Sequence, residues 1–158
     1  MKKRVSDSYT EQVQILNPSS MNGYNRLFGG KLMQWIDVVG GVVARRHSNC
    51  NVTTACVDQL TFDGAAYIND TLVLRGHITY VGTTSMEVCV KTYVEQLTGE
   101  LQLINTAYLV MVALDGLERP TPVPGLILST PEEEREWAEG KARNQHRKAL
   151  RQPKEELL

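Results

Sequence analysis

The chain has few features that would cross-link it or anchor it in a membrane. Its cysteines, Cys50, Cys56 and Cys89, form no C-x-x-C pair and no His/Cys cluster with metal-ligand spacing. We therefore expect reduced thiols, no metal site and no disulfide framework, as in a cytosolic protein. No stretch approaches the roughly 18 apolar residues of a membrane-spanning helix, and no apolar run follows the basic start MKKR as in a signal peptide. We expect a cytoplasmic protein without a membrane partner.

The charge balance argues against a nucleic-acid partner. The 17 Lys and Arg and the 18 Asp and Glu leave a formal net charge of -1. A chain without a net basic field lacks the long-range attraction that draws basic proteins to nucleic acids. We therefore expect no nucleic acid among its partners.

The length of 158 residues suggests one domain that buries its own core without metals or disulfides. We expect this domain to cover residues 1–158, with the core over about 8–125 and a charged tail over 126–158. Residues 1–7 are expected to be loosely held, as chain ends often are.

One long helix is predicted between Gly30 and Asn49, because apolar residues recur there at helical spacing. The helix begins near Gly30 and runs for about five turns. Asn49 is a typical stop, and the preceding Arg45, Arg46 and His47 suit the negative end of a helix. The apolar positions are Leu32, Trp35, Ile36, Val39 and Val43.

Alternating apolar residues predict one short strand before this helix and four longer strands after it. Turn-forming residues such as Asp115-Gly116 separate them. In the second of the longer strands, the alternation predicts that Leu72 and Tyr80 lie on the same face. The predicted strands are Tyr9–Leu16, Val52–Phe62, Thr71–Tyr80, Ser85–Gln96 and Leu101–Leu114.

A second helix is predicted over residues 131–151, which are charged and rich in helix formers. Ser129 or Thr130 is a suitable N-cap, and Pro131 is a suitable first-turn residue. The resulting order is one strand, a long helix, four strands and a tail helix. Strands grouped after a helix favour an α+β fold with an antiparallel sheet over alternating βαβ units.

The run N-x-x-N-R-L-F-G-G-K-L-M-Q-W-I-D, from Asn22 to Asp37, carries a more specific signal. Together with the later strand start at Gly82–Ser85, it resembles the signature of the hotdog acyl-CoA thioesterases. In that family an Asn precedes a Phe-Gly-Gly loop, and an Asp lies seven residues beyond the second Gly, as Asp37 does here.

Three loop positions depart from the family pattern. Members often carry glycine where this chain has Asn25, and a glycine commonly stands where this chain has Asn69. Members also often carry a proline within residues 63–66, which are Asp-Gly-Ala-Ala here. These changes fall in loops, so we expect this chain to differ from the family in loop shape and acyl-chain preference more than in chemistry.

The resemblance implies a hotdog fold, in which an antiparallel sheet wraps around one long central helix, here with a C-terminal tail helix. It implies hydrolysis of acyl-CoA to free fatty acid and CoA, with no cofactor because CoA is part of the substrate. In related thioesterases the Asn and the Asp of one site come from different subunits. The resemblance therefore implies a homo-oligomer, at least a dimer and possibly a hexamer built as a trimer of dimers.

The residues from Asn22 to Asp37 can perform this chemistry. The helix N-terminus at Gly29 and Gly30 offers unpaired N–H groups, and glycine lets a thioester carbonyl approach them closely. Asp37 lies about two turns, or roughly 10 Å, further along, where it can take a proton from water or attack the carbonyl itself. Asn22 can donate and accept hydrogen bonds, and so orient the water. Asp37, Asn22 and Gly30 are the predicted catalytic residues.

Further residues are expected to bind the substrate. The segment Gly82–Ser85 is expected to line the pantetheine arm of CoA. Arg143 and Arg147 are expected to hold its phosphates, because residues four apart on a helix share a face. The alternative for these two is a solvated charged helix with Glu–Arg pairs. The predicted substrate-binding residues are Phe28, Gly29, Thr54, Gly82, Thr83, Thr84, Ser85, Arg143 and Arg147.

Two other functions stay open on the sequence. A hotdog enoyl-CoA hydratase or dehydratase would pair a His with a carboxylate to move protons on carbon. No His lies between Asn22 and Asp37, and His47 is too far along the helix to share the site. A non-catalytic acyl-CoA-binding module would keep a pocket and lose the carboxylate, whereas Asp37 is present.

Overall fold

The central element of the computed structural model, which describes residues 1–151, is the helix α1 (Gly29–Ser48). It ends as expected at Asn49, whose φ of 56° breaks the helix and whose N–H donates to the Arg45 carbonyl at 2.8 Å. The helix buries its predicted apolar side against the sheet. That side carries Leu32, Ile36, Val39 and Val43.

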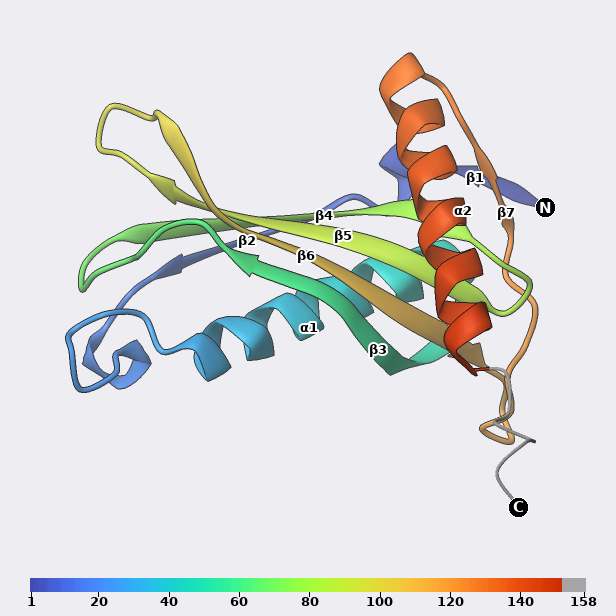
Figure 1. Cartoon of the computed structure of the whole chain (residues 1–158), viewed down its shortest axis with the longest axis horizontal. Helices are drawn as coiled ribbons and strands as arrows, with labels where there is room; N and C mark the ends of the chain where they lie inside the picture. The colour runs from blue at the N-terminus through green and yellow to red at the C-terminus, as the bar shows by residue number, and fades with distance from the viewer. Residues whose placement is uncertain (152–158) are drawn as a thin grey trace.

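A five-stranded antiparallel sheet curves around α1 (Figure 1). All five predicted strands are confirmed within a residue or two at their ends. Their spatial order is β2-β4-β5-β6-β3, so β2 and β3 form the two edges. The strands are β2 (Thr10–Ile15), β3 (Asn51–Phe62), β4 (Thr71–Val81), β5 (Ser85–Glu95) and β6 (Leu101–Leu114).

Close contact between α1 and the sheet depends on two glycines. A Cβ added at Gly76 of β4 would lie 2.8 Å from a methyl group of Val39 and 3.0 Å from one of Val43. On the helix side, a Cβ at Gly40 would lie 3.1 Å from the Met111 Cε atom. The missing side chains let helix and sheet approach closely, as in other tightly packed cores.

The N-terminal segment corrects the prediction that residues 1–7 are loosely held. Lys2–Arg4 form the strand β1, which pairs in parallel with β7 (Gly125–Ile127), and the 3-10 helix Val5–Asp7 follows. Val5 is buried. The sequence could not show this, because three-residue strands carry no periodicity and their partners lie at the other end of the core.

Tyr80 is a second correction. The β4–β5 register shifts between Ile78 and Tyr80, so one strand carries an extra residue there. Such a bulge reverses the alternation beyond it. Ile78 stays in the core, whereas the Tyr80 ring lies 4.5 Å from the ring of Trp137 in the tail helix.

The predicted tail helix is confirmed as α2 (Pro131–Arg151), which crosses the outer face of the sheet (Figure 1). The Thr130 hydroxyl accepts a hydrogen bond from the Glu133 N–H at 3.1 Å, and the Glu133 carboxylate accepts one from the Ser129 N–H at 2.6 Å. Thr130 is thus the N-cap of α2, and the Glu133 carboxylate also holds the preceding residue, Ser129. Residues 152–158 of the predicted tail lie outside the described residues.

Among residues 1–151, no helix has the length and apolar character needed to cross a membrane. Within the same residues, no three His, Cys, Asp or Glu side chains cluster as metal ligands would. The remaining short element is the 3-10 helix η2 (Pro18–Ser20), which precedes the loop leading into α1.

Candidate active site

The N-terminus of α1 presents two free backbone donors. The Phe28 carbonyl accepts hydrogen bonds from the N–H groups of Lys31 and Leu32, at 3.0 and 3.2 Å. The N–H groups of Gly29 and Gly30 have no acceptor in the described part of the chain, as expected for the first residues of a helix. The Phe28 ring lies over Gly30, where an added Cβ would come within 2.7 Å of it. A side chain at position 30 would therefore require the Phe28 ring to move.

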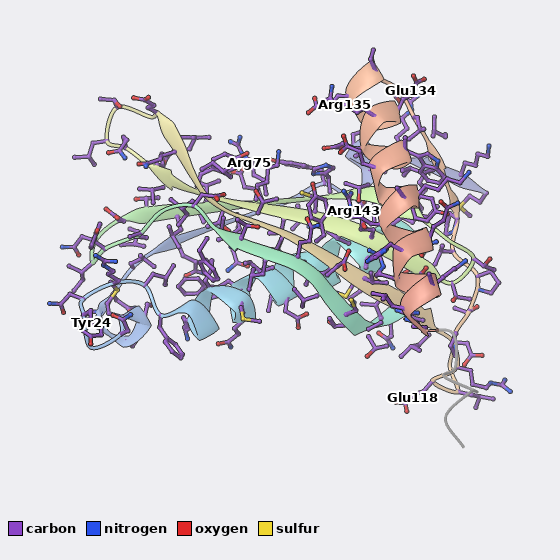
Figure 2. The ribbon with its side chains drawn as sticks, viewed as in Figure 1. Tyr24, Arg75, Glu118, Glu134, Arg135 and Arg143 are labelled. Atoms are coloured by element: carbon purple, nitrogen blue, oxygen red, sulfur yellow. The ribbon has the colours of Figure 1, made fainter. Side chains whose placement is uncertain are left out.

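Asn22 shapes the loop before this helix. Its side-chain oxygen accepts hydrogen bonds from the N–H groups of Tyr24 and Arg26, at 2.9 and 3.2 Å. Figure 2 shows Tyr24 at the outer tip of the loop that leads into α1. The oxygen is thus occupied within the loop, whereas the amide NH2 group has no acceptor among the described residues. Both N–H donors of the Asn22 amide are therefore available to a ligand.

The two asparagines that replace family glycines have a common explanation. Asn25 has a φ of 57° and Asn69 a φ of 68°. This left-handed region favours glycine, and asparagine is among the side chains that tolerate it best. Asparagine can therefore stand in place of glycine at both positions with little backbone strain.

Asp37 is exposed on α1, and Thr54 of β3 holds it in place. The Thr54 hydroxyl donates a hydrogen bond of 2.6 Å to the Asp37 Oδ1 atom. The β3–β6 register shifts directly after Thr54, between Thr54 and Cys56. The structure thus brings together two of the predicted site residues, and leaves the second carboxylate oxygen, Oδ2, without a partner in the described residues.

An apolar recess of about 120 Å³ opens beside this carboxylate. Five of its six lining residues are apolar. A second recess, of about 170 Å³, lies at the start of α1 and includes Asn22 and Arg26 in its wall. The first recess is lined by Met33, Ile36, Asp37, Val57, Leu60 and Leu109.

The predicted catalytic residues fall into two groups within one chain. Asn22, Gly29 and Gly30 lie at the start of α1, whereas Asp37 and Thr54 lie about two turns, or roughly 10 Å, further along the helix. A thioester carbonyl at the helix N-terminus would need a base within about 3 Å, or one water molecule away. One chain does not supply this arrangement.

The Gly82–Ser85 turn lies at the opposite end of α1 from Gly30 (Figure 1). The Gly82 N–H donates to the Ser85 carbonyl at 2.9 Å, and the Val123 N–H donates to the Thr83 carbonyl at 2.9 Å. The Ala113 N–H donates to Thr84 at 3.0 Å. Thr83, Thr84 and Ser85 are therefore held in a fixed turn, but that turn meets neither group of site residues within one chain.

Arg143 and Arg147 converge on a carboxylate of their own chain. Arg143 donates two hydrogen bonds to Glu87, at 2.7 and 3.1 Å, and Figure 2 shows it on the side of α2 toward the sheet. Arg147 lies 3.1 Å from Glu87 and 2.8 Å from Asp58. The predicted convergence of the two guanidinium groups is correct, but its partner is a buried carboxylate. The alternative of a solvated charged helix does not describe these two arginines, which are largely buried against the sheet. Phosphate binding by them stays a prediction.

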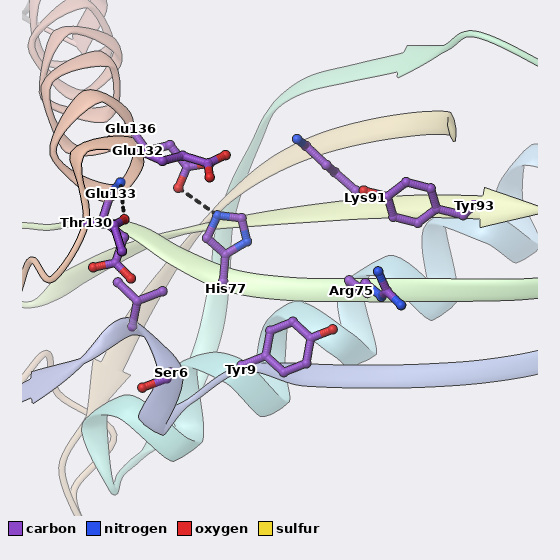
Figure 3. A pocket seen from close by; sticks show the side chains of 11 residues that line it. Ser6, Tyr9, Arg75, His77, Lys91, Tyr93, Thr130, Glu132, Glu133 and Glu136 are labelled. Atoms are coloured by element: carbon purple, nitrogen blue, oxygen red, sulfur yellow. Dashed lines mark hydrogen bonds and ion pairs between the residues drawn. The ribbon is translucent and has the colours of Figure 1, made fainter. Parts of the chain in front are cut away.

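A larger recess, of about 630 Å³, lies on the outer face of the sheet (Figure 3). It contains none of the predicted site residues. In it the His77 Nε2 atom lies 2.9 Å from the Glu136 carboxylate, a hydrogen bond that links β4 to α2. This recess thus lies at the junction between the sheet and α2.

The remaining nucleophiles and bases lie apart from Asp37. His47 is fully buried, where its Nε2–H donates to the Pro124 carbonyl at 2.8 Å. Burial lowers the pKa of His47, so the expected positive charge at the end of α1 is not provided by this residue. Burial also raises the pKa of the Cys89 thiol to about 12, which keeps it protonated. Among residues 1–151 of one chain, Asp37 has Thr54 as its side-chain partner and no His partner of the kind a hydratase needs.

The chain is similar in sequence and structure to known thioesterases. A family model described as the thioesterase superfamily matches residues 24–99. A Bacillus subtilis protein named an uncharacterized acyl-CoA thioester hydrolase is 43% identical over 117 residues, 73% of this chain and 68% of that protein. The crystal structure of an apo-hexameric acyl-CoA thioesterase has 37% identity and a TM-score of 0.90, and the match covers 94% of this chain and 96% of that one.

An acyl-CoA hydrolase from Staphylococcus aureus, solved with butyryl-CoA, CoA and CoA disulfide, has 30% identity and a TM-score of 0.91, over 96% of this chain and 93% of that one. It has also been solved as an Asp-to-Ala, an Asn-to-Ala and a Thr-to-Ala variant. There the Asn precedes the Asp by 15 residues and the Thr follows it by 17. Asn22, Asp37 and Thr54 have the same two spacings.

These matches identify the class of protein. The chain belongs to the thioesterase superfamily and has the hotdog fold. Within that superfamily, its relatives are acyl-CoA thioester hydrolases. Some are longer: this chain spans 40% of a rat relative named cytosolic acyl coenzyme A thioester hydrolase, at 30% identity over 151 residues.

Proposed function

We propose that the protein hydrolyses acyl-CoA to a free fatty acid and CoA, with Asp37 as the general base. The observation that carries the proposal is the pairing of Asp37 with Thr54 beside an apolar recess. The hydrogen bond fixes one carboxylate oxygen and leaves the other to accept a proton. The shared spacing with the three substituted positions of the Staphylococcus aureus hydrolase supports the same residues.

The reaction needs only water as second reactant. The Gly30 N–H, with Gly29 beside it, donates to the thioester oxygen at the positive end of α1 and stabilises the charge that develops there. Asp37 accepts a proton from water as its oxygen attacks the carbonyl carbon, and the Asn22 amide orients that water. The C–S bond then breaks, and the CoA sulfur leaves as a thiolate or takes the proton from Asp37. No cofactor takes part in this scheme.

The site requires two copies of the chain. Since Gly30 and Asp37 of one chain lie too far apart, an antiparallel partner helix would place the partner's Asp37 beside Gly30. The surface around α1 and the edge strand β3 suits a second copy, because large apolar side chains are exposed there. They are Phe28, Met33, Val38, Val57 and Phe62. The hexameric relative supports assembly of such dimers into a larger oligomer.

The same proposal includes the substrate contacts and the location. The bound substrate is proposed to be lined by Phe28, Thr54 and the Gly82–Ser85 turn of the assembled protein. The turn lies far from Asp37 within one chain, so another copy of the chain is proposed to contribute it. A cytoplasmic location is supported by the free cysteines and by the name of the rat relative.

Release of free thiol from acyl-CoA tests the proposed activity. The purified protein should release CoA from at least one member of a panel of saturated acyl-CoA esters, scored with a colorimetric thiol reagent. The Asp37→Ala protein, prepared in parallel, gives the background rate. Binding of acyl-CoA without thiol release would instead indicate a non-catalytic binding module.

Mixing two inactive variants tests the shared site. Asn22→Ala and Asp37→Ala chains should each be inactive alone, and their mixture should regain about one quarter of wild-type activity at equal concentrations, because half of the dimers carry one intact site. The variants are mixed under conditions that allow subunit exchange, verified by native mass spectrometry. Full exchange without recovered activity would mean that each site forms within one chain.

A further inference from the structure

The recess beside Asp37 has a definite direction. Thr54, Val57 and Leu60 follow one another along β3, so Leu60 lies at the end remote from the Asp37–Thr54 hydrogen bond. On the helix side, Met33 lies one turn before Asp37, or about 6 Å along the axis. The carboxylate thus marks one end of the recess, and Met33 and Leu60 mark the other.

The lining suits an alkyl chain. Ile36 and Leu109 form the buried floor and are almost fully inaccessible to solvent. Asp37 is the one polar residue among the six that line the recess. The second recess, at the start of α1, has Asn22 and Arg26 in its wall, so an alkyl chain there would contact polar groups.

The size limits what the recess can hold. An apolar cavity of about 150 Å³ accommodates benzene, which has six carbons. At about 120 Å³, the recess beside Asp37 has room for roughly four to six carbons. The axial distance of about 6 Å between Asp37 and Met33 agrees with a chain of that length.

We propose that this recess binds the first carbons of the acyl chain, and that Leu60, with Met33, sets the preferred chain length to short acyl groups of about four to six carbons. The inference rests on the proposed thioesterase activity and adds its substrate class. Each methylene that fits should raise kcat/KM by about fourfold, and methylenes beyond Leu60 should add nothing or lower it.

A substitution pair at Leu60 tests this inference. Acyl-CoA esters from two to sixteen carbons are assayed with the wild-type protein, and kcat/KM should peak at about four to six carbons. Leu60→Ala should move the peak to longer chains and raise the octanoyl-to-butyryl ratio of kcat/KM by roughly tenfold or more. Leu60→Phe should move it toward acetyl. Leu103→Ala, the same truncation at an exposed leucine of β6, should leave the profile unchanged.

The outcomes separate the two proposals. If no ester is hydrolysed, the proposed function fails. If esters are hydrolysed but the wild-type profile rises steadily to palmitoyl, or both Leu60 variants keep the wild-type peak, the assignment of the recess is wrong. Thermal unfolding and native mass spectrometry check that each variant is folded and assembled. Met33→Ala, at a position exposed within one chain, provides a second opening of the recess should Leu60→Ala not fold. It should also shift the peak to longer chains.

Discussion

Replacing Asp37 by alanine is expected to lower kcat by about 10²-fold or more and to leave the fold intact. The loss follows from removing the group that takes the proton from water. Stability should change little, because Asp37 is exposed within its chain and its one side-chain hydrogen bond, to Thr54, joins two exposed residues. The measurements are steady-state thiol release and thermal unfolding.

Matched variants separate the chemistry from the positioning. Asp37→Asn keeps the shape and a hydrogen-bond acceptor for Thr54 but cannot act as a base, so it should be nearly as inactive as Asp37→Ala. Thr54→Val removes the donor alone and should lower kcat by a smaller factor. Thr53→Val, at the preceding position of β3, whose side chain points to the other face, serves as the control. Near-wild-type turnover by folded Asp37→Ala would contradict the assignment of the base.

Replacing Glu87 by alanine is expected to destabilise the protein by about 3 kcal/mol or more. The Glu87 side chain is only 1% exposed, and it accepts hydrogen bonds from Arg143, Arg147 and the Thr79 hydroxyl. Truncating it would leave the Arg143 guanidinium group beneath α2 without its carboxylate. Urea unfolding at a fixed protein concentration measures the change, because an oligomer's stability depends on concentration.

The exposed pair between Arg135 and Glu132, labelled in part in Figure 2, provides the comparison. Its atoms are 3.9 Å apart and both side chains are about two-thirds exposed, at 65% and 68%. Arg135→Ala should therefore change the stability by about 0.5 kcal/mol or less. If Glu87→Ala cost no more than Arg135→Ala, the ion pairs beneath α2 would contribute little to its attachment.

Local sequence patterns predict most of the helices and strands of this fold. Helical spacing predicts α1 almost to the residue, and alternation predicts five of the strands, because each element buries one face on a common core. The spacing from Asn22 to Asp37 also predicts that Gly30 lies at the helix start and that Asp37 lies further along the helix. These signals are local, so they can be read from the sequence without knowledge of the tertiary structure.

The missed features depend on distant partners. Glu87 lies in an alternating strand, where the pattern predicts an ordinary outer-face residue. It is buried because α2 packs across this face of the sheet and Arg143 of α2 donates to its carboxylate. The bulge before Tyr80 reverses the side-chain direction without a sequence signal in the strand itself. The contact between Thr54 and Asp37 likewise depends on how β3 returns along α1, and the family resemblance indicated Thr54 only as a substrate-binding residue.

The pairing of β1 with β7 has a consequence for how the fold is reached. Lys2 aligns with Gly125, so almost all of the sheet and α1 lie between the two partners in the chain. Closing so large a loop costs more conformational entropy than forming the hairpins β4–β5 and β5–β6, whose strands are joined by short turns. The meander is therefore expected to organise early in folding, with the three-residue β1 joining once both the core and β7 are in place. In the native state, the amides of β1 should exchange with solvent through local opening, well before those of β5.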